Sequence, residues 1–366
     1  MHHLSYGDVK TAADRVADRV RPVAVARADA GSPGAGPDTG GAELYFALEF
    51  MQHTGSFKAR GALNFLLAHR EQGELPDAGV TLASGGNAGL ACAWAARGLG
   101  VPATVFLPET APRAKVERLR AYGADVRLAG AEYAEAAAAC EAFAADTGAL
   151  PSHAYDHPLI AAGAGTMVEE IRAQVPLIDT VVVAVGGGGL FAGVAAAAQH
   201  HGIRVVAVEP ERCRALNAAL EAGRVVDVEV DSVAADSLGA RRATPMALAA
   251  AGHRYVRSVL VGDDAVVAAR HGLWEHYRLA VENAAGTAVA GVAGVAGCGN
   301  AHAPYVPAAG ERVAVVLCGS NADPAELTRD AGPSRETELP RDGEPSQEAE
   351  PSPDAEPSRD GADSQR

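Results

Sequence analysis

Short apolar runs alternate with alanine-rich stretches along much of the chain. Alternation of this kind, with short connections, predicts parallel strands joined by helical crossovers and therefore an α/β fold. In chain order the segments read VTLAS, NAGLACAWAARGLG, VPATVFLP, a charged helix over 112–122, ADVRLAG, DTVVVAVGGGG, a helix reaching Ala198, and RVVAVEP.

Two details of this pattern indicate where a ligand would bind. The run VVVAV at 181–185 is apolar at every position, which is typical of a strand covered by helices on both faces of its sheet. Glycines follow several runs at the point where strand gives way to helix. Open α/β sheets bind ligands at these junctions, so we expect a site there.

The last segment, residues 331–366, differs in composition from the rest. It holds ten acidic residues against four arginines, repeats the letters EPS and has no aromatic residue. Such a segment buries too little apolar surface to offset the entropy of ordering it. We expect a disordered acidic tail without a catalytic part.

Composition narrows the class of protein. The net charge of −15 argues against a nucleic-acid partner. No apolar run approaches the roughly 20 residues that span a bilayer, so we expect no membrane segment and a cytoplasmic protein. The five cysteines are scattered singly without a CxxC pair, which argues against disulfides and a zinc cluster. With 366 residues, 48% of them hydrophobic, a two-domain enzyme is expected.

Three segments carry chemical signal. Residues 53–61 read HTGSFKARG and place Lys58 directly ahead of an apolar helix. Residues 84–89 read SGGNAG and form a turn whose backbone amides suit an anion at a helix N-terminus. Gly186–Gly189 form a second strand-to-helix turn, where amides can surround a phosphate. A lysine imine, a phosphate cradle and a carboxylate-binding turn are the parts of a pyridoxal-phosphate enzyme acting on amino acids.

A nicotinamide cofactor is the remote alternative. The pattern Gly187-x-Gly189-x-x-Ala192 fits the relaxed dinucleotide fingerprint, and Glu209 follows at about the distance of the acid that binds the ribose. That interpretation leaves Lys58 and the SGGN turn without a purpose. Nothing downstream supplies a hydride-transfer arrangement.

The same residues resemble a known family. The segments TGSFKARGA, ASGGNAGLA, YDHPLIAAGAGT, the tetraglycine and VVLCGSNAD stand in the order of the tryptophan-synthase-β-like (fold type II) pyridoxal-phosphate enzymes. The resemblance is to the serine/threonine dehydratase branch and covers roughly residues 10 to 325. It implies β-elimination of L-threonine or L-serine to a 2-oxo acid and ammonia.

The resemblance implies a role for each site residue. Lys58 would bind the cofactor covalently, Phe57 would pack under its ring and Asn87 would bind its hydroxyl. The phosphate would lie on Gly186, Gly187, Gly188 and Gly189. The substrate carboxylate would lie on Ser84, Gly85, Gly86 and Ala88, and Cys318 would face the pyridine nitrogen. Glu282 matches a glutamate that the family keeps near the site, and its role stays open.

The resemblance also implies an organisation. We expect a large cofactor domain from residues 1–60 and 150–330, an inserted small domain over 61–149, and a homodimer that takes an amino-acid substrate. Relatives with a divalent-cation site carry a second acid six residues after the one matched by Glu209. Ala215 stands there, so no metal is expected.

Three further alternatives stay open. The first is a β-replacement enzyme of the cysteine-synthase branch, which tends to show Lys-Asp-Arg where this chain has Lys58-Ala59-Arg60. The second is a dehydratase for another β-hydroxy amino acid such as 3-hydroxyaspartate. The third is a binding protein without catalysis. The presence of Lys58 and Asn87 argues against it. Serine-racemase relatives use a serine where this chain has Gly85, so we expect elimination with little racemisation.

Overall fold

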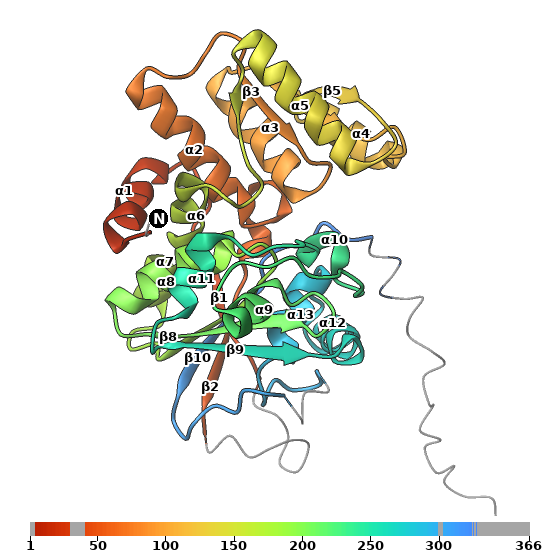
Figure 1. Ribbon diagram of the computed structural model, residues 1–366. Coiled ribbons are helices and arrows are strands. Elements are labelled where there is room, and N and C mark those ends of the chain that lie inside the picture. The colour runs from red at the N-terminus through yellow and green to blue at the C-terminus, as the bar shows by residue number, and fades with distance from the viewer. Residues whose placement is uncertain (1–3, 30–40, 299–302, 324, 326, 328–366) are drawn as a thin grey trace, which may run out of the picture. The chain divides into compact units, whose positions relative to one another are not determined.

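The computed structural model describes residues 4–29, 41–298, 303–323, 325 and 327, and these contain two sheets flanked by helices (Figure 1). The larger sheet has six strands in the order β1-β2-β10-β7-β8-β9. Every neighbouring pair is parallel except β1 with β2. The strands are β1 (Val25–Arg27), β2 (Glu43–Ala47), β7 (Thr180–Ala184), β8 (Arg204–Pro210), β9 (Val256–Val261) and β10 (Arg312–Val316).

The smaller sheet has four parallel strands in the order β5-β4-β3-β6. They are β3 (Val80–Ala83), β4 (Ala103–Leu107), β5 (Asp125–Leu128) and β6 (Leu150–Pro151). The central strands β3, β4 and β7 are buried at every position, as expected of strands with helices on both faces. The predicted α/β class is confirmed.

Helices connect the strands, and Figure 1 shows α3, α4 and α5 beside the strands β3 and β5. Two 3₁₀ helices, η1 (Glu49–Met51) and η2 (His53–Gly55), precede α2. No helix in the described part of the chain is long and apolar enough to cross a bilayer. The α-helices are α1 (Tyr6–Val16), α2 (Lys58–Gln72), α3 (Asn87–Leu99), α4 (Arg113–Ala121), α5 (Tyr133–Thr147), α6 (Pro158–Gly165), α7 (Met167–Gln174), α8 (Gly189–His200), α9 (Ala215–Ala222), α10 (Ala235–Leu238), α11 (Pro245–Ala251), α12 (Asp263–Tyr277) and α13 (Asn283–Ala290).

Glycines let α2 and α6 pack backbone against backbone. A Cβ atom on Gly61 of α2 would lie 2.5 Å from the carbonyl oxygen of Ile160 in α6. One on Gly163 of α6 would lie 2.7 Å from the carbonyl oxygen of Arg60 in α2. Only glycine allows such an approach. The contact fixes the first turn of α2, which begins at Lys58.

The strands of the larger sheet come from residues 25–47 and 180–316, and those of the smaller sheet from residues 80–151. The division into domains at residues 60 and 150 stays a prediction. The predicted acidic tail, residues 331–366, lies outside the described residues.

Candidate active site

Lys58 is half-buried at the start of α2. Its Nζ donates a hydrogen bond of 3.1 Å to the carbonyl oxygen of Ala154. The same atom lies 4.7 Å from the centre of the Phe57 ring. The amine is therefore held in place without a carboxylate partner at hydrogen-bonding distance in the described structure.

The surroundings of Lys58 lower the pKa of its amine to about 8, since burial disfavours the ammonium form. Cys318 and Glu282 oppose this shift, which places both groups near the amine. A neutral amine is both a nucleophile and a base. Near neutral pH, Lys58 is therefore much closer to its reactive form than an exposed lysine would be.

The segment before Lys58 is fixed by the loop that follows β10. The backbone amide of Phe57 donates to the carbonyl oxygen of Cys318 at 3.0 Å, and that of Ser320 donates to Gly55 at 2.9 Å. Gly55 has a φ of +74°, a left-handed conformation that suits glycine. These contacts bring Lys58 to Cys318 across 260 residues of sequence, because β10 lies next to β2 in the larger sheet.

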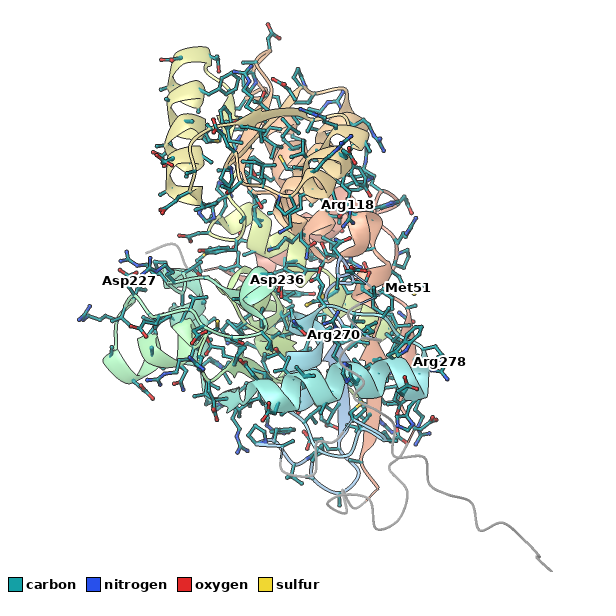
Figure 2. All side chains as sticks on the ribbon, turned by 90° about the vertical axis from the view of Figure 1, so that its right-hand side faces the viewer. Met51, Arg118, Asp227, Asp236, Arg270 and Arg278 are labelled. Carbon is teal, nitrogen blue, oxygen red and sulfur yellow. The ribbon has the colours of Figure 1, made fainter. Side chains whose placement is uncertain are left out.

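Asn87, the first residue of α3, is held by a hydrogen-bond network that joins the two sheets. Its Nδ2 donates to both carboxylate oxygens of Glu282, at 2.8 and 3.0 Å. The backbone amide of Asn321 donates to Glu282 Oε1 at 2.9 Å, and its Nδ2 donates to Asn87 Oδ1 at 2.6 Å. Burial raises the pKa of Glu282, while the bonds from Asn87 and Asn321 favour its charged form. Arg118 of α4, labelled in Figure 2, also donates to Asn321 Oδ1.

The tetraglycine turn between β7 and α8 has no room for side chains at three of its positions. A Cβ on Gly187 would lie 2.2 Å from the Tyr155 ring, and one on Gly189 would lie 2.6 Å from the Tyr155 carbonyl oxygen. A Cβ on Gly188, whose φ is +97°, would lie 2.4 Å from that of Ala247. Gly189 begins the 12-residue helix α8, whose first amides are free to bind an anion.

The turn Ser84–Ala88 follows β3 and leads into α3. The backbone amide of Gly86 donates to Ser84 Oγ at 3.4 Å. A Cβ on Gly85 would lie 2.6 Å from Cδ2 of the buried Leu107, whereas nothing lies within 4 Å of one on Gly86. Gly85 therefore faces the interior of the smaller sheet and Gly86 faces open space.

The residues around Lys58 fit an aldehyde that carries a phosphate. Burial raises the pKa of Cys318 to about 12, so its thiol stays protonated and neutral. The hydroxyls of Thr54 and Ser56 are buried and have no hydrogen-bond partner among the described residues. Buried hydroxyls of this kind are uncommon without a ligand or water. Together with the first amides of α8, they suit a polar ligand such as a phosphate.

Glu209, the candidate ribose-binding acid, has another role. It is fully buried, and its two oxygens accept hydrogen bonds from the backbone amides of Leu216 and Asn217, at 2.7 and 2.8 Å. Burial raises the pKa of Glu209 to about 7. The carboxylate thus caps α9, which speaks against the dinucleotide interpretation. Within the described residues no cluster of three or more His, Cys, Asp or Glu side chains could hold a metal ion.

Sequence reasoning missed part of this arrangement. It left Glu282 without a role and did not single out Asn321 or Tyr155, although all three lie in segments that it quoted or discussed. Asn321 is the asparagine of VVLCGSNAD, and Tyr155 opens YDHPLIAAGAGT. The available signal for Asn321 was its place in the loop after β10, three residues beyond the predicted site residue Cys318.

Comparisons with known proteins agree on one family. A family profile described as "Pyridoxal-phosphate dependent enzyme" matches residues 24–319. An L-threonine ammonia-lyase of Geobacter sulfurreducens is 35% identical over 283 residues, which cover 77% of this chain and 69% of that protein. A human serine dehydratase-like protein is 35% identical over 292 residues, 77% of this chain and 86% of its own. The structure of maize serine racemase aligns with a TM-score of 0.78 at 26% identity, covering 90% of this chain and 97% of that one.

Proposed function

Since the chain belongs to the pyridoxal-phosphate dependent enzymes, we propose that it is an ammonia-lyase that converts L-threonine and L-serine to a 2-oxo acid and ammonia. The observation that carries this proposal is the Lys58 amine, whose pKa is lowered to about 8 beside Cys318 and Glu282. A second support is the set of similar proteins named as threonine ammonia-lyase and serine dehydratase-like.

Each part of the site has a proposed partner on the cofactor. Lys58 would hold it covalently and Phe57 would contact its ring. Gly186–Gly189 would hold its phosphate, Asn87 its hydroxyl and Cys318 its ring nitrogen. When bound, pyridoxal phosphate supplies a ring that accepts the electron pair from the Cα–H bond of the substrate.

The chain's own groups then bind the substrate and move its protons. The amides of Ser84–Ala88 at the start of α3 would bind the substrate carboxylate. Lys58 Nζ would take the proton from the substrate Cα, a role that its lowered pKa of about 8 supports near neutral pH. The neutral thiol of Cys318 is a weak donor, which limits how strongly the ring withdraws electrons and favours prompt loss of the β-hydroxyl.

A screen of β-hydroxy amino acids tests this function. We expect L-threonine or L-serine to give one molecule of ammonia for each molecule of 2-oxo acid. Supplying O-acetyl-L-serine with sulfide in parallel tests the β-replacement alternative. No turnover of any hydroxy amino acid would overturn the lyase assignment, and faster cysteine formation would replace it with a synthase.

The lowered pKa of Lys58 predicts a pH dependence for cofactor binding. In protein freed of cofactor, the rate of covalent reaction with added pyridoxal phosphate should rise with pH around a midpoint near 8, because only the neutral amine reacts. The substitution Glu282→Gln should lower that midpoint, since it removes a charge that favours the ammonium form. The rate is followed by absorbance. A midpoint above 10 in the unmodified protein would contradict the proposed environment.

Elimination should outpace racemisation. Racemisation needs an acid or base on each side of the substrate Cα, and neither Gly85 nor Gly86 offers one opposite Lys58. With L-serine in heavy water, D-serine should form at least roughly a hundredfold more slowly than pyruvate, given the usual contribution of a general acid or base. Chiral chromatography measures both enantiomers. Comparable rates would make the protein a racemase with a lyase side reaction.

We further propose that the enzyme is a homodimer and that it lies in the cytoplasm. Each chain would have a large domain from residues 1–60 and 150–330 and a small domain over 61–149. The net charge of −15 supports a protein without a nucleic-acid partner. Light scattering of the purified protein tests the dimer.

A further inference from the structure

The side chain of Asn321 lies between two segments that are assigned to the cofactor. Asn321 follows β10 in the loop that also holds Cys318. Its Nδ2 donates to Asn87 Oδ1 at 2.6 Å and to the carbonyl oxygen of Thr54 at 2.7 Å. One amide group therefore contacts both the first residue of α3 and the segment that leads into Lys58.

A third contact fixes the direction of the Asn321 amide. Arg118 of α4, labelled in Figure 2, donates to Asn321 Oδ1. A guanidinium can only donate hydrogen bonds and a backbone carbonyl oxygen can only accept them, so Oδ1 must face Arg118 and Nδ2 must face Thr54. Exchanging the two ends of the amide would set donor against donor on one side and oxygen against oxygen on the other.

The direction of Asn321 is passed on to Asn87. Because Asn321 Nδ2 donates to Asn87 Oδ1, the Nδ2 of Asn87 faces Glu282, whose two oxygens accept from it at 2.8 and 3.0 Å. The backbone amide of Asn321 donates to the same carboxylate at 2.9 Å. The proposed contact with the ring oxygen of the cofactor would therefore use the N–H donors of Asn87.

The contact with Thr54 matters because the backbone of this residue is strained. Thr54 has a φ of +66°, a left-handed conformation that β-branched residues rarely adopt. A strained residue persists only where its surroundings hold it, and such residues cluster at active sites. The hydrogen bond from Asn321 holds the Thr54 carbonyl four residues before Lys58. Loss of this bond would loosen the turn that sets the position of Lys58.

We propose that Asn321 is a positioning residue for Asn87 and Lys58, the groups assigned to the ring oxygen and the aldehyde of the cofactor. Arg118 fixes the direction of the Asn321 amide and so joins α4 to the loop after β10. This inference rests on the proposed function. Neither Asn321 nor Arg118 has to touch the cofactor or the substrate in this role.

The substitution Asn321→Leu tests the positioning role. Leucine is close to asparagine in size and adds no charge, but it cannot donate to Asn87 or Thr54. The dissociation constant of pyridoxal phosphate should rise at least roughly fivefold, because two polar groups lose their partner. Equilibrium dialysis of the cofactor-loaded enzyme against decreasing cofactor concentrations measures this constant. An unchanged circular dichroism spectrum of the variant separates lost positioning from lost fold.

The substitution Arg118→Ala tests whether the guanidinium acts through Asn321. Arg118 is exposed, so its removal should leave the fold intact. The dissociation constant should rise roughly threefold or more in the single variant. It should not rise further when Asn321 is already leucine, since effects of residues that act through one another are not additive. Arg120→Ala, exposed on the same helix, is the matched control and should bind the cofactor as the unmodified enzyme does.

The outcomes separate this inference from the proposed function. An unchanged dissociation constant in Asn321→Leu would overturn the positioning role and leave the proposed function intact. An equal loss from Arg118→Ala with and without Asn321, or an equal loss in Arg120→Ala, would contradict the role of Arg118. Absence of covalently bound pyridoxal phosphate in the unmodified protein would overturn the proposed function itself.

Discussion

Replacing Lys58 with alanine should abolish turnover of L-threonine and L-serine, with a loss of at least roughly 10³-fold in kcat. The substitution removes both the covalent attachment of the cofactor and the base that takes the Cα proton. Because Lys58 is half-buried and, among the described residues, its amine contacts only the Ala154 carbonyl and the Phe57 ring, its loss should leave the fold intact. Steady-state kinetics and circular dichroism measure the two effects.

The chain offers matched controls for this substitution. It has three lysines, and Lys10 and Lys115 are exposed on α1 and α4. Lys10→Ala and Lys115→Ala should keep the activity of the unmodified enzyme. Retained turnover in Lys58→Ala, within tenfold of the unmodified enzyme, would remove Lys58 from the mechanism.

Replacing Arg60 with methionine should destabilise the protein by about 3–5 kcal/mol, the usual cost of breaking a buried ion pair from one side. Arg60 and Glu49 are both fully buried, and the guanidinium donates to the two Glu49 oxygens at 2.6 and 3.0 Å. It also donates to both oxygens of Glu170, at 2.6 and 2.8 Å. The substitution leaves Glu49 buried without its cation. Denaturant unfolding of the cofactor-loaded protein measures the free-energy change.

The folding stability that Arg60→Met loses should also depend on pH. Burial already raises the pKa of Glu49 in the folded protein, and Arg60 opposes that shift. Without Arg60, the Glu49 carboxyl keeps its proton to a higher pH in the folded protein than in the unfolded chain. In the unfolded chain this carboxyl has its ordinary pKa of about 4.3. Folding stability then falls as pH rises. The loss of unfolding free energy in Arg60→Met, relative to the unmodified protein, should therefore be smaller at pH 5 than at pH 8. An equal loss of stability at pH 5 and pH 8 would contradict the interpretation that the substitution leaves Glu49 buried without a cation.

The control for this prediction is an exposed pair of the same chemistry. Arg113 and Glu117 form an i,i+4 ion pair on α4 with side chains 91% and 57% exposed. Arg113→Met should change the free energy of unfolding little, because exposed pairs contribute little to stability. A loss equal to that of Arg60→Met would show that burial is not the cause.

The fold and the chemistry-bearing segments were predictable because each depends on local pattern. Continuous valine runs predicted β7, and four glycines predicted the turn after it, since Gly187 and Gly189 admit no Cβ. The role of Lys58 stays a prediction, made because its neighbours form a recognisable segment. The direction in which a Cβ on Gly85 would point was not predictable. Its contact with Leu107 depends on how β3 pairs with β4.

The network around Asn87 was beyond sequence reasoning for a different reason. Its partners Glu282 and Asn321 lie 195 and 234 residues away along the chain. They meet Asn87 only through the packing of the smaller sheet's α3 against loops of the larger sheet. The pairing of Arg60 with Glu49 and Glu170 depends on tertiary packing in the same way. Local patterns indicate which residues carry chemistry, and tertiary contacts decide what holds them.

Mapping the covalent attachment of pyridoxal phosphate tests the central claim most directly. Borohydride reduction of the purified enzyme, followed by proteolysis and mass spectrometry, should place the reduced adduct on the peptide that contains Lys58. With Lys10 and Lys115 as the only other lysines of the chain, the assignment is unambiguous. An adduct on Lys10 or Lys115 with Lys58 unmodified, or no adduct on any lysine, would contradict the account.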